Sequence, residues 1–514
     1  MENRKGGERT HGYTALLSGV LLILLLSPAA LLGHISETSG LGDRASALGG
    51  AVTALPNDPT AVYYNPAGLT LLDGWRLWYD HAIFNGQAQS NNLTDGEKSR
   101  FGLELFNNRP TPILTGQLGQ ARVALGMLGV GGLASQWPSD IGEKRFFGVD
   151  TKVLHATLTP ALAYPVTTNF PIGATLEISA FTKIENRQLI GDGFVGDFAT
   201  HVLGVPPGLF DTRNGKPDGT VLLLNDHDFP TGLKPNNTLT SDFQHFSFVT
   251  GMLYRPLSFM QIGVTYRERF KPRMVGRAKL GFSPEVKAAF LGVLQDDEAP
   301  FEADFLTRPR MVNLGMAVQP RPHLLLLLDG QWSGWSDFRN LGLKIGQGRQ
   351  GPGLGLLGQR EFIIPTRMHD TFAVRVGMEY ELLHDLYLRL GYWLDKHPQS
   401  DRFALPATLP NDIHYLSMGS GWENVFGLPL YLGLYGQVGV TEPRRLSVGE
   451  SRIAGGLKNF SPGPSGRLLQ FGSNDVEILT KSARFYSFGL TLEWRFFGSG
   501  SSNQSRARRS FLGQ

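Results

Sequence analysis

The chain has 514 residues, with 48 basic and 45 acidic side chains, a formal net charge of +3, 64 glycines and no cysteine. The absence of cysteine excludes a disulfide scaffold, a thiolate metal site and a cysteine nucleophile. The charge balance is near neutral and forms no basic stripe, which argues against a nucleic-acid partner. Only one stretch, near the N-terminus, is long and apolar enough to span a bilayer as a helix, so a polytopic helical transporter is excluded as well.

The first 30 residues have the pattern of a secretory signal peptide. Basic residues between positions 4 and 9 precede an apolar run at 15–26, and small residues follow at 27–30. An uncleaved single-span anchor would carry a similar apolar run, but the short core and the small residues after it favour cleavage. We therefore predict that residues 1–30 are a signal peptide and that the mature protein is exported.

Residues 44–74 are rich in small residues, glycine and proline, show no strand period and have too little bulk for a core of their own. Directly after two tyrosines this segment contains a turn-forming run, made of Asn65, Pro66, Ala67 and Gly68. Two interpretations remain open. The segment is either a flexible lead-in to the first strand, or a hatch that folds back into a barrel and turns tightly at Asn65 and Pro66.

Between residues 75 and 497 the dominant sequence period is two. In the last strand, one face carries Tyr486, Phe488, Leu490, Leu492, Trp494 and Phe496, and small or charged residues occupy the other face. Such alternation predicts strands with one apolar and one polar face. The strands are long, aromatic residues gather at their ends, and charges fall almost only on the polar face. These three features favour a barrel in lipid over a soluble sandwich.

The spacing predicts fourteen strands, at residues 75–87, 111–119, 121–130, 151–164, 170–187, 242–256, 259–276, 305–319, 323–338, 370–382, 385–396, 413–424, 428–440 and 478–497. Short turns alternate with long segments at 88–110, 131–150, 188–241, 277–304, 339–369, 397–412 and 441–477, as periplasmic turns and extracellular loops do. The sheet has to close, because an open edge in lipid leaves backbone groups unpaired. The predicted fold class is therefore all-β, a transmembrane antiparallel 14-stranded β-barrel at 75–497 with an N-terminal hatch at 31–74.

Three groups of residues within the barrel are candidates for function. Near the end of the third strand lie glycines that permit a kink or bulge, namely Gly126, Gly129, Gly131 and Gly132. In the segment 277–304, Ser283 and Pro284 begin a predicted helix with an apolar stripe at Val286, Ala289, Phe290, Val293 and Leu294. This stripe either packs against the neighbouring 188–241 segment, which contains Val205, Leu209 and Phe210, or forms a surface groove with it.

The third group consists of charged residues that the period-two pattern turns into the lumen. It contains Arg375, Arg389, Glu379 and Asp395 on neighbouring strands. A ligand that carries a carboxylate needs a cation here, because burying an unpaired carboxylate is costly. Arginine provides planar, bidentate donors for this purpose. The alternative is a structural network in which these opposite charges simply pair with one another.

The segment before the first strand resembles the hatch of a known family, the long-chain fatty acid and aromatic hydrocarbon transporters of the Gram-negative outer membrane. The resemblance consists of an Ala/Gly-rich stretch, a polar turn, and an aromatic residue before Asn-Pro-Ala-Gly, found here at 45–54, 57–59, Tyr64 and 65–68. Residues 329–338 are similar to the family's tryptophan-rich strand end, and 389–398 with 409–419 to its late strand–loop–strand pair. The family usually ends on the terminal aromatic of the last strand, here Phe497. This chain adds a polar tail at 498–514, which we predict to be disordered.

The resemblance implies a passive outer-membrane channel for hydrophobic molecules, first of all long-chain fatty acids, with aromatic hydrocarbons as the alternative within the same family. It implies capture in the surface groove, passage to an interior pocket behind the hatch, and lateral exit at a kinked early strand. No cofactor, metal or catalytic activity is expected. The expected partners are the transported molecules and outer-membrane lipid, and the chain is expected to act as a monomer.

Two functions outside this family remain as alternatives. A general diffusion porin would lack the hatch, and a barrel lipid hydrolase would need a Ser-His pair that faces lipid. The two GxGxxG matches within 346–358 are interpreted as loop glycines, because a dinucleotide site needs a strand before it and a helix after it.

Overall fold

The computed structural model describes residues 40–92, 98–105, 111–136, 150–190, 195, 206, 208–209, 216, 218–227, 246–270, 274–292, 294–303, 308–338, 340–345, 360–365, 367–403, 412–450, 461–462, 469–470 and 478–496. The predicted signal peptide at 1–30 and the predicted tail at 498–514 lie outside these residues, as do Phe210 and Val293.

Fourteen antiparallel strands pair in a closed ring. In ring order they are β1 (Trp75–Asn92), β3 (Thr111–Leu118), β4 (Ala121–Gln136), β5 (Asp150–Thr167), β6 (Phe170–Ile190), β8 (Phe246–Leu257), β9 (Met260–Arg267), β12 (Met311–Arg321), β13 (Leu324–Ser333), β16 (Thr371–Leu383), β17 (Leu386–Asp395), β18 (Ile413–Trp422), β19 (Leu430–Thr441) and β24 (Arg484–Phe496). The ring closes where β24 pairs with β1. Each of the fourteen predicted strands overlaps one of these, so the predicted barrel is confirmed.

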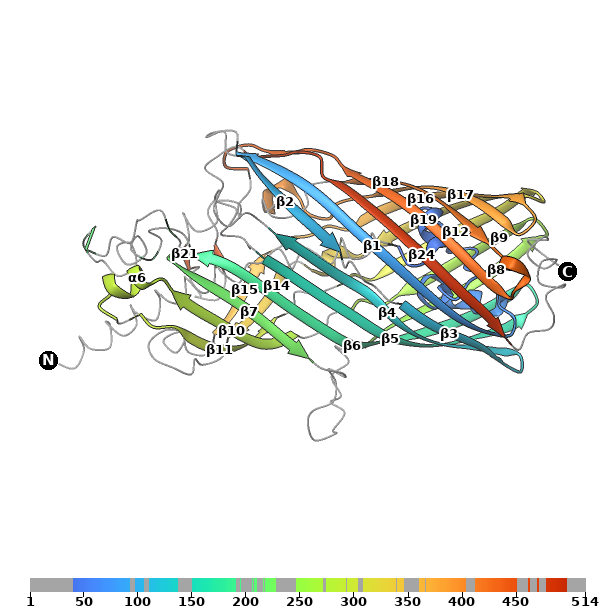
Figure 1. Cartoon of the computed structure of the whole chain (residues 1–514), viewed down its shortest axis with the longest axis horizontal. Coiled ribbons are helices and arrows are strands. Elements are labelled where there is room, and N and C mark those ends of the chain that lie inside the picture. Colours follow the sequence, from blue (N-terminus) through green and yellow to red (C-terminus); the bar gives the residue numbers. More distant parts are fainter. Residues whose placement is uncertain are drawn as a thin grey trace.

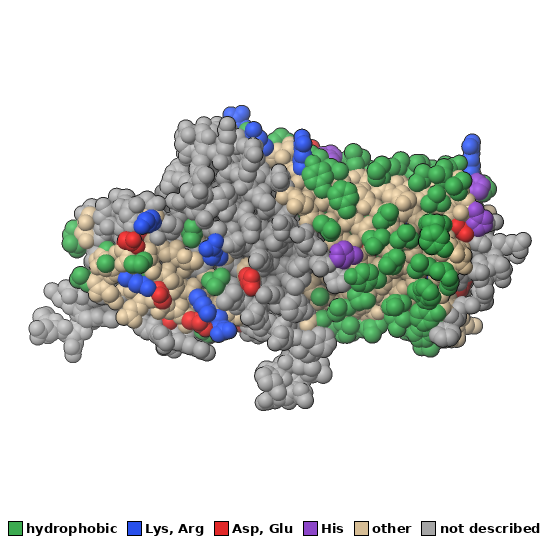
Figure 2. All heavy atoms as spheres, viewed as in Figure 1, with side chains coloured by type: hydrophobic (Ala, Val, Ile, Leu, Met, Phe, Trp, Pro, Cys, Tyr) green, Lys and Arg blue, Asp and Glu red, His purple; other side chains and the backbone are tan. Residues whose placement is uncertain are grey.

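The outer face of the ring is apolar and its inner face is polar. In β24 the outward side chains of Tyr486, Phe488 and Trp494 are exposed, whereas the inward Thr491 and Glu493 are buried. Hydrophobic side chains cover the half of the barrel that contains the short turns, and charged side chains gather over the opposite half (Figure 2). Within the described ranges, no helix has the length and hydropathy needed to cross a membrane.

Several segments that the sequence assigns to loops contain strands instead, and residues 478–480, predicted as the start of the last strand, form a separate strand. Eight further strands join the same sheet: β2 (Lys98–Leu105), β7 (Gly219–His227), β10 (Met274–Phe282), β11 (Asp297–Ala303), β14 (Asn340–Ile345), β15 (Arg360–Pro365), β20 (Arg444–Leu446) and β23 (Ile478–Thr480). A separate pair is formed by β21 (Ser461–Pro462) and β22 (Leu469–Gln470). Strands such as β10 and β11 lie at the end of the molecule opposite the short turns (Figure 1). A strand outside lipid needs no apolar face, and this explains why the alternation did not reveal them.

The short helices lie in the hatch and in the connections. The hatch contains α3 (Asp43–Ala47), α4 (Ala61–Tyr64) and the 3₁₀ helix η2 (Pro66–Leu71), and the strands of the ring enclose it (Figure 1). The connections contain α6 (Pro284–Ala289), η5 (Trp335–Asp337), η7 (Asp401–Phe403) and η8 (Val425–Gly427). Residues 40–74 therefore fill the lumen, which sets this barrel apart from an open pore.

The buried core lies between the hatch and the wall. One apolar cluster joins hatch residues such as Val62 and Leu69 to Trp78 and Leu128 of the wall. A second cluster joins Ala-rich hatch positions around Leu48 to side chains of β12 and β13. Small hatch side chains thus pack directly on the wall, as the Ala/Gly-rich sequence requires.

Three cross-strand glycine pairs let the hatch backbone touch the wall. Gly173 and Gly251 are register partners on β6 and β8. Gly263 pairs with Gly315, and Gly377 with Gly391. A Cβ atom at any of these six positions would lie within 3.0 Å of a hatch atom, which no real Cβ atom tolerates without a shift of its neighbour. Part of the high glycine content therefore serves the contact between wall and hatch.

Candidate functional site

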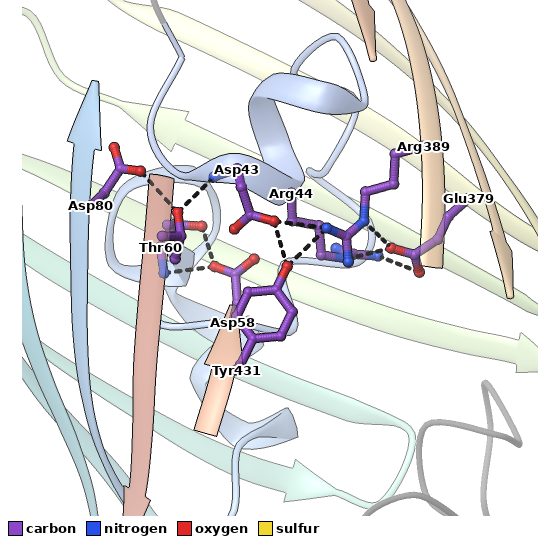
Figure 3. Close-up of polar contacts among 9 residues, drawn as sticks. Asp43, Arg44, Asp58, Thr60, Asp80, Glu379, Arg389 and Tyr431 are labelled. Atoms are coloured by element: carbon purple, nitrogen blue, oxygen red, sulfur yellow. Dashed lines mark hydrogen bonds and ion pairs between the residues drawn. The ribbon is translucent and has the colours of Figure 1, made fainter. Parts of the chain in front are cut away.

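The first half of the hatch, residues 41–49, is attached to the wall by charged groups (Figure 3). Arg389 Nη1 of β17 lies 2.7 Å from Asp43 Oδ2, and Arg389 Nε lies 2.7 Å from Glu379 Oε2 of β16. Arg44 forms a second ion pair with Glu379, at 3.0 Å. The Tyr431 hydroxyl of β19 donates to Asp43 and accepts from Arg389. We call these five residues the charged latch.

The second half of the hatch, residues 53–71, is attached to the wall mainly by bonds to its backbone. Asn65 is fully buried and begins η2, where its Oδ1 accepts from the Ala67 N–H. Its Nδ2 donates to the Thr53 carbonyl at 2.8 Å and to the Met252 carbonyl of β8 at 3.2 Å. Gln261 of β9 donates to the Ala54 carbonyl, and Thr175 of β6 donates to the Val62 carbonyl. Asn65 and Pro66 therefore do sit at a tight turn.

A small pocket of about 40 Å³ lies on the extracellular side of the hatch. Its lining includes Tyr63 and Tyr64 of the hatch, and Arg375 and Trp393 of the wall. Arg375 donates to Gln331 Oε1 at 2.6 Å and lies 4.6 Å from the Trp393 ring centre. Several lining polar atoms are buried and have no hydrogen-bond partner among the described residues: Ser46 Oγ, Asn313 Oδ1, Arg375 Nε, Trp393 Nε1 and Gln437 Oε1. Unsatisfied groups of this kind are typical of a site that binds a polar ligand group or water.

A larger cavity of about 350 Å³ lies on the periplasmic side of the hatch, and we call it the vestibule. The hatch contributes Leu55, Asn57 and Thr70 to its lining, and the wall contributes the ends of strands next to the short turns. Arg389 and Glu379 of the charged latch also reach its lining. The hatch thus separates the small extracellular pocket from the larger periplasmic vestibule, and different polar residues line the two spaces.

The four predicted lumen residues all face inward, but they lie in different surroundings. Arg389 and Glu379 belong to the charged latch and pair with the hatch. Arg375 lines the extracellular pocket and lies beside Trp393. Asp395 is buried at the outer end of β17, where it pairs in register with Ile413. For Arg389 and Glu379 these contacts match the structural network that the sequence left as the alternative.

The predicted kink region coincides with an irregularity of the wall. Register partners of β4 and β5 shift between Leu128 and Gly131, so that two residues of β4, Gly129 and the next one, face a single residue of β5. On its other side, β4 pairs with β3 as far as Gly126 and with β2 from Ala134 onward. Gly131 and Gly132 lie between these two pairings. The residues that join β2 to β3, 106–110, lie outside the described part of the chain.

The predicted loop helix forms as α6 but is shorter than its apolar stripe suggests. Ser283 caps it by accepting from the Val286 N–H at 3.3 Å, and the chain leaves the helix at Phe290 and Gly292. Val286, Phe290 and Leu294 are buried, whereas Leu209 of the neighbouring segment is exposed. The Ser283 N–H donates to the Asp218 carbonyl, which ties α6 to that segment. Val293 and Phe210, the other predicted groove residues, lie outside the described residues.

An ion pair fixes the end of the α6 connection. Lys287 Nζ donates to Asp296 Oδ2 at 2.7 Å, and the Phe282 N–H donates to Asp296 Oδ1 at 2.9 Å. Partial burial alone would raise the pKa of the Asp296 carboxyl, but these hydrogen bonds outweigh it and hold the pKa below its usual range. The connection is therefore anchored by an ionised aspartate at neutral pH.

Comparisons with known proteins agree with this architecture. The family model described as "Outer membrane protein transport protein (OMPP1/FadL/TodX)" matches residues 27–425. The chain belongs to this family. It is accordingly an outer-membrane protein of the Gram-negative type that transports hydrophobic compounds, and the family consists of transport channels. No curated protein sequence matches the chain.

Solved structures show the same fold at low sequence identity. A Pseudomonas aeruginosa FadL homologue is 19% identical, with 90% of this chain and 98% of that chain covered and a TM-score of 0.64. The Pseudomonas putida toluene transporter TodX is 14% identical, with 90% and 100% covered and a TM-score of 0.64. The Ralstonia pickettii toluene transporter TbuX is 14% identical, with 89% and 99% covered and a TM-score of 0.58.

Sequence reasoning missed the hatch side of the charged latch. Asp43 and Arg44 are charged residues that directly precede an Ala/Gly-rich segment, and this contrast was the available signal. Their partners Arg389 and Glu379 were selected from the wall alone. A charge in a segment that is otherwise made of small residues needs a partner of opposite charge when it is buried. The charged pair in the hatch therefore predicts charged partners on the wall, and the inward wall charges predict partners in the hatch.

Proposed function

We propose that this family member transports hydrophobic molecules that carry a carboxylate, with long-chain fatty acids as the main class. The observation that carries this proposal is Arg375, whose described side-chain hydrogen-bond partner is the neutral Gln331 and whose Nε lacks a partner. Arg375 is half-buried and forms no ion pair among the described residues, although Asp329 of β13 lies opposite it in register and interacts with its charge. A guanidinium that no carboxylate binds directly favours an anionic ligand group. The adjacent pocket of about 40 Å³ holds roughly three water molecules, which suits a carboxylate and not an acyl chain.

The path in this proposal begins at the surface and ends beside the hatch. The α6 connection and the segment with Leu209 would capture the apolar molecule, with Val286, Phe290, Val293, Leu294, Leu209 and Phe210 as groove residues. The headgroup would then bind at Arg375, and displacement of the turn at Asn65 and Pro66 would open the way. The bulge at Gly129, next to Gly131 and Gly132, supports a lateral exit into lipid. The channel would work as a monomer surrounded by outer-membrane lipid.

Aromatic hydrocarbons are the second candidate class. Tyr63, Tyr64 and Trp393 bring three aromatic rings to the same pocket, and rings of this kind pack well against an unsubstituted arene. Such a substrate needs no cation, so it should ignore the charge of Arg375. The two classes therefore respond differently to one substitution.

The test is uptake of a labelled fatty acid and of toluene by cells that produce Arg375→Gln. We expect the variant to lose at least tenfold in fatty acid uptake and to keep its toluene uptake. Arg321→Gln is the matched control, because Arg321 is exposed at a short turn and loses the same charge away from the pocket. Equal loss of both substrates would mean that Arg375 supports the lumen, and unchanged uptake of both would refute the headgroup site.

A further inference from the structure

Among the described lumen arginines, most are paired with a carboxylate. Arg76 and Arg495 pair with Glu493, Arg267 and Arg308 with Glu177, and Arg389 with Asp43. Two described arginines instead have a glutamine as their side-chain partner. One is Arg375 on the extracellular side of the hatch, and the other is Arg255 of β8, whose Nη2 donates to Gln261 Oε1 at 3.1 Å.

Arg255 lies on the periplasmic side of the hatch. The strand β8 touches the hatch at Gly251, where a Cβ atom would lie 2.0 Å from Asn65 Oδ1. From Gly251 the strand continues through Arg255 to Leu257 and the short turn before β9. Successive inward positions of a strand are two residues apart, so Arg255 faces the same lumen as Gly251, two inward positions closer to the periplasm. It lines the vestibule.

The carboxylates around the vestibule already have partners. Glu379 pairs with Arg44 and Arg389, and Glu423 pairs with Arg495. Glu381 lies 3.0 Å from the His323 imidazole. Arg255 is half-buried. Among the described residues that line the vestibule, it is the cation that pairs with no carboxylate. Neutral polar groups, including Gln319 and Thr70, complete its side of the lining.

The glutamine beside Arg255 connects this cation to the hatch. Gln261 is buried, accepts from Arg255 through Oε1, and donates through Nε2 to the Ala54 carbonyl at 2.5 Å. The guanidinium is therefore held in place by one neutral oxygen. Among the described residues no other group binds its side chain, so its remaining N–H groups can bind an anion in the bidentate geometry that suits a carboxylate.

We propose that the vestibule is a second carboxylate-binding site, in which Arg255 receives the headgroup of the transported acid after it has passed the hatch. This inference rests on the proposed function, because it takes the substrate class from there. A cavity of about 350 Å³ is large enough for the headgroup and part of the apolar chain. The site gives the acid a binding position on the periplasmic side, in addition to any lateral exit into lipid.

The experiment measures how many molecules of labelled decanoate bind to each full-length chain in lipid nanodiscs, by equilibrium dialysis. Apart from a molecule in the surface groove, which every variant keeps, the wild type should bind two per chain. Arg255→Gln and Arg375→Gln should each bind one, and Arg255→Lys should retain two with weakened affinity because the charge stays. Arg321→Gln, which loses the same charge at an exposed turn, should bind two.

The outcomes separate the two proposals. If Arg255→Gln still binds as many molecules as the wild type, the vestibule site is wrong, whatever Arg375 does. If only Arg375→Gln leaves binding unchanged, the proposed function loses its headgroup site while the vestibule site stands. Competition by inorganic phosphate at equal concentration would also overturn the proposal, because it would mark Arg255 as a general anion site rather than one for an organic acid.

Discussion

The two halves of the hatch are attached to the barrel wall by different chemistry. Residues 41–49 lie against β17, β18, β19 and β24, where charged side chains bridge hatch and wall. Residues 61–71 lie against β5, β6 and β8, where neutral side chains bind hatch carbonyls. Two charged wall residues are exceptions in the second half. Arg267 donates to the Tyr63 carbonyl and lies 4.1 Å from the Tyr63 ring centre, and Asp329 of β13 accepts from the Thr53 N–H at 2.8 Å.

This difference indicates that the two halves respond differently to the loss of one contact. A buried ion pair that loses one partner leaves an uncompensated charge, which costs about 3–5 kcal/mol. A neutral hydrogen bond that loses its donor leaves a carbonyl, which costs about 1–3 kcal/mol. Loss of a single contact should therefore detach the first half from the wall, whereas the second half should lose only part of its attachment. The second half is thus the part of the hatch that can move at the lower cost in free energy.

The largest expected effect comes from the charged latch. In Arg389→Leu, Asp43 loses its ion-pair partner and Glu379 keeps only Arg44. We expect the free energy of docking of residues 41–49 to fall by about 3–5 kcal/mol. Hydrogen exchange of the backbone amides of α3 measures this change, because the opened segment exchanges at a rate set by that free energy.

A compensating variant tests the physical reason. In Arg389→Leu combined with Asp43→Leu, the buried charge that lacks a partner is removed, so slow exchange in α3 should return in part. If the single variant exchanges as slowly as the wild type, the latch contributes no attachment. The comparison between the two halves would then fail at its stronger side.

The second prediction concerns Asn65 in the other half. Asn65→Ala removes the hydrogen bonds to the Thr53 and Met252 carbonyls and the cap on Ala67. We expect a loss of about 2–3 kcal/mol in local stability, close to the cost of one or two buried carbonyls. Amide exchange should accelerate in 65–71 and stay unchanged in α3, and uptake of hydrophobic substrate should fall while the barrel still assembles.

A variant of the wall provides the control for Asn65. Gly251→Ala leaves every hatch residue intact but places a Cβ atom 2.0 Å from Asn65 Oδ1. It should accelerate exchange in the same residues as Asn65→Ala. Faster exchange with unchanged uptake in both variants would mean that this turn stabilises the hatch without controlling the path.

The sequence predicted the wall well and the hatch contacts poorly, for a physical reason. Lipid imposes an apolar residue at every second position, so spans such as 370–382 and 413–424 could be located within one or two residues of the observed strands. The outer strands β7 and β11 carry no such alternation in sequence, so the sequence assigns them to loops. Period-two analysis also turned Arg375 and Arg389 inward, but only the structure separates the one that pairs with Asp43 from the one that does not.

The vestibule shows where residue patterns give least information. Arg255 has the same alternation as its neighbours on β8, and nothing in the sequence marks it as different from Arg267 on β9. The two arginines differ in their spatial neighbours, because Glu177 of β6 lies beside Arg267 and Gln261 lies beside Arg255. Charge pairing across strands that are far apart in sequence is set by barrel register and hatch position together.

The smallest expected effect compares a single hydroxyl in each half of the hatch. Tyr431→Phe removes the bonds to Asp43 and to the Arg389 guanidinium but leaves the contact between these two residues in place. Thr175→Val removes the bond to the neutral Val62 carbonyl. Hydrogen bonds to charged groups contribute about 1.5–3 kcal/mol, and neutral bonds about 0.5–1.5 kcal/mol. Exchange should therefore accelerate more in α3 of Tyr431→Phe than in α4 of Thr175→Val.

Both residues belong to the wall, and both changes remove one hydroxyl. The order of the two effects therefore reports the chemistry of each half and not the amount of side chain lost. The reverse order would show that the charged pair already satisfies Asp43 without Tyr431, and that the second half depends on single neutral bonds more than the first half does.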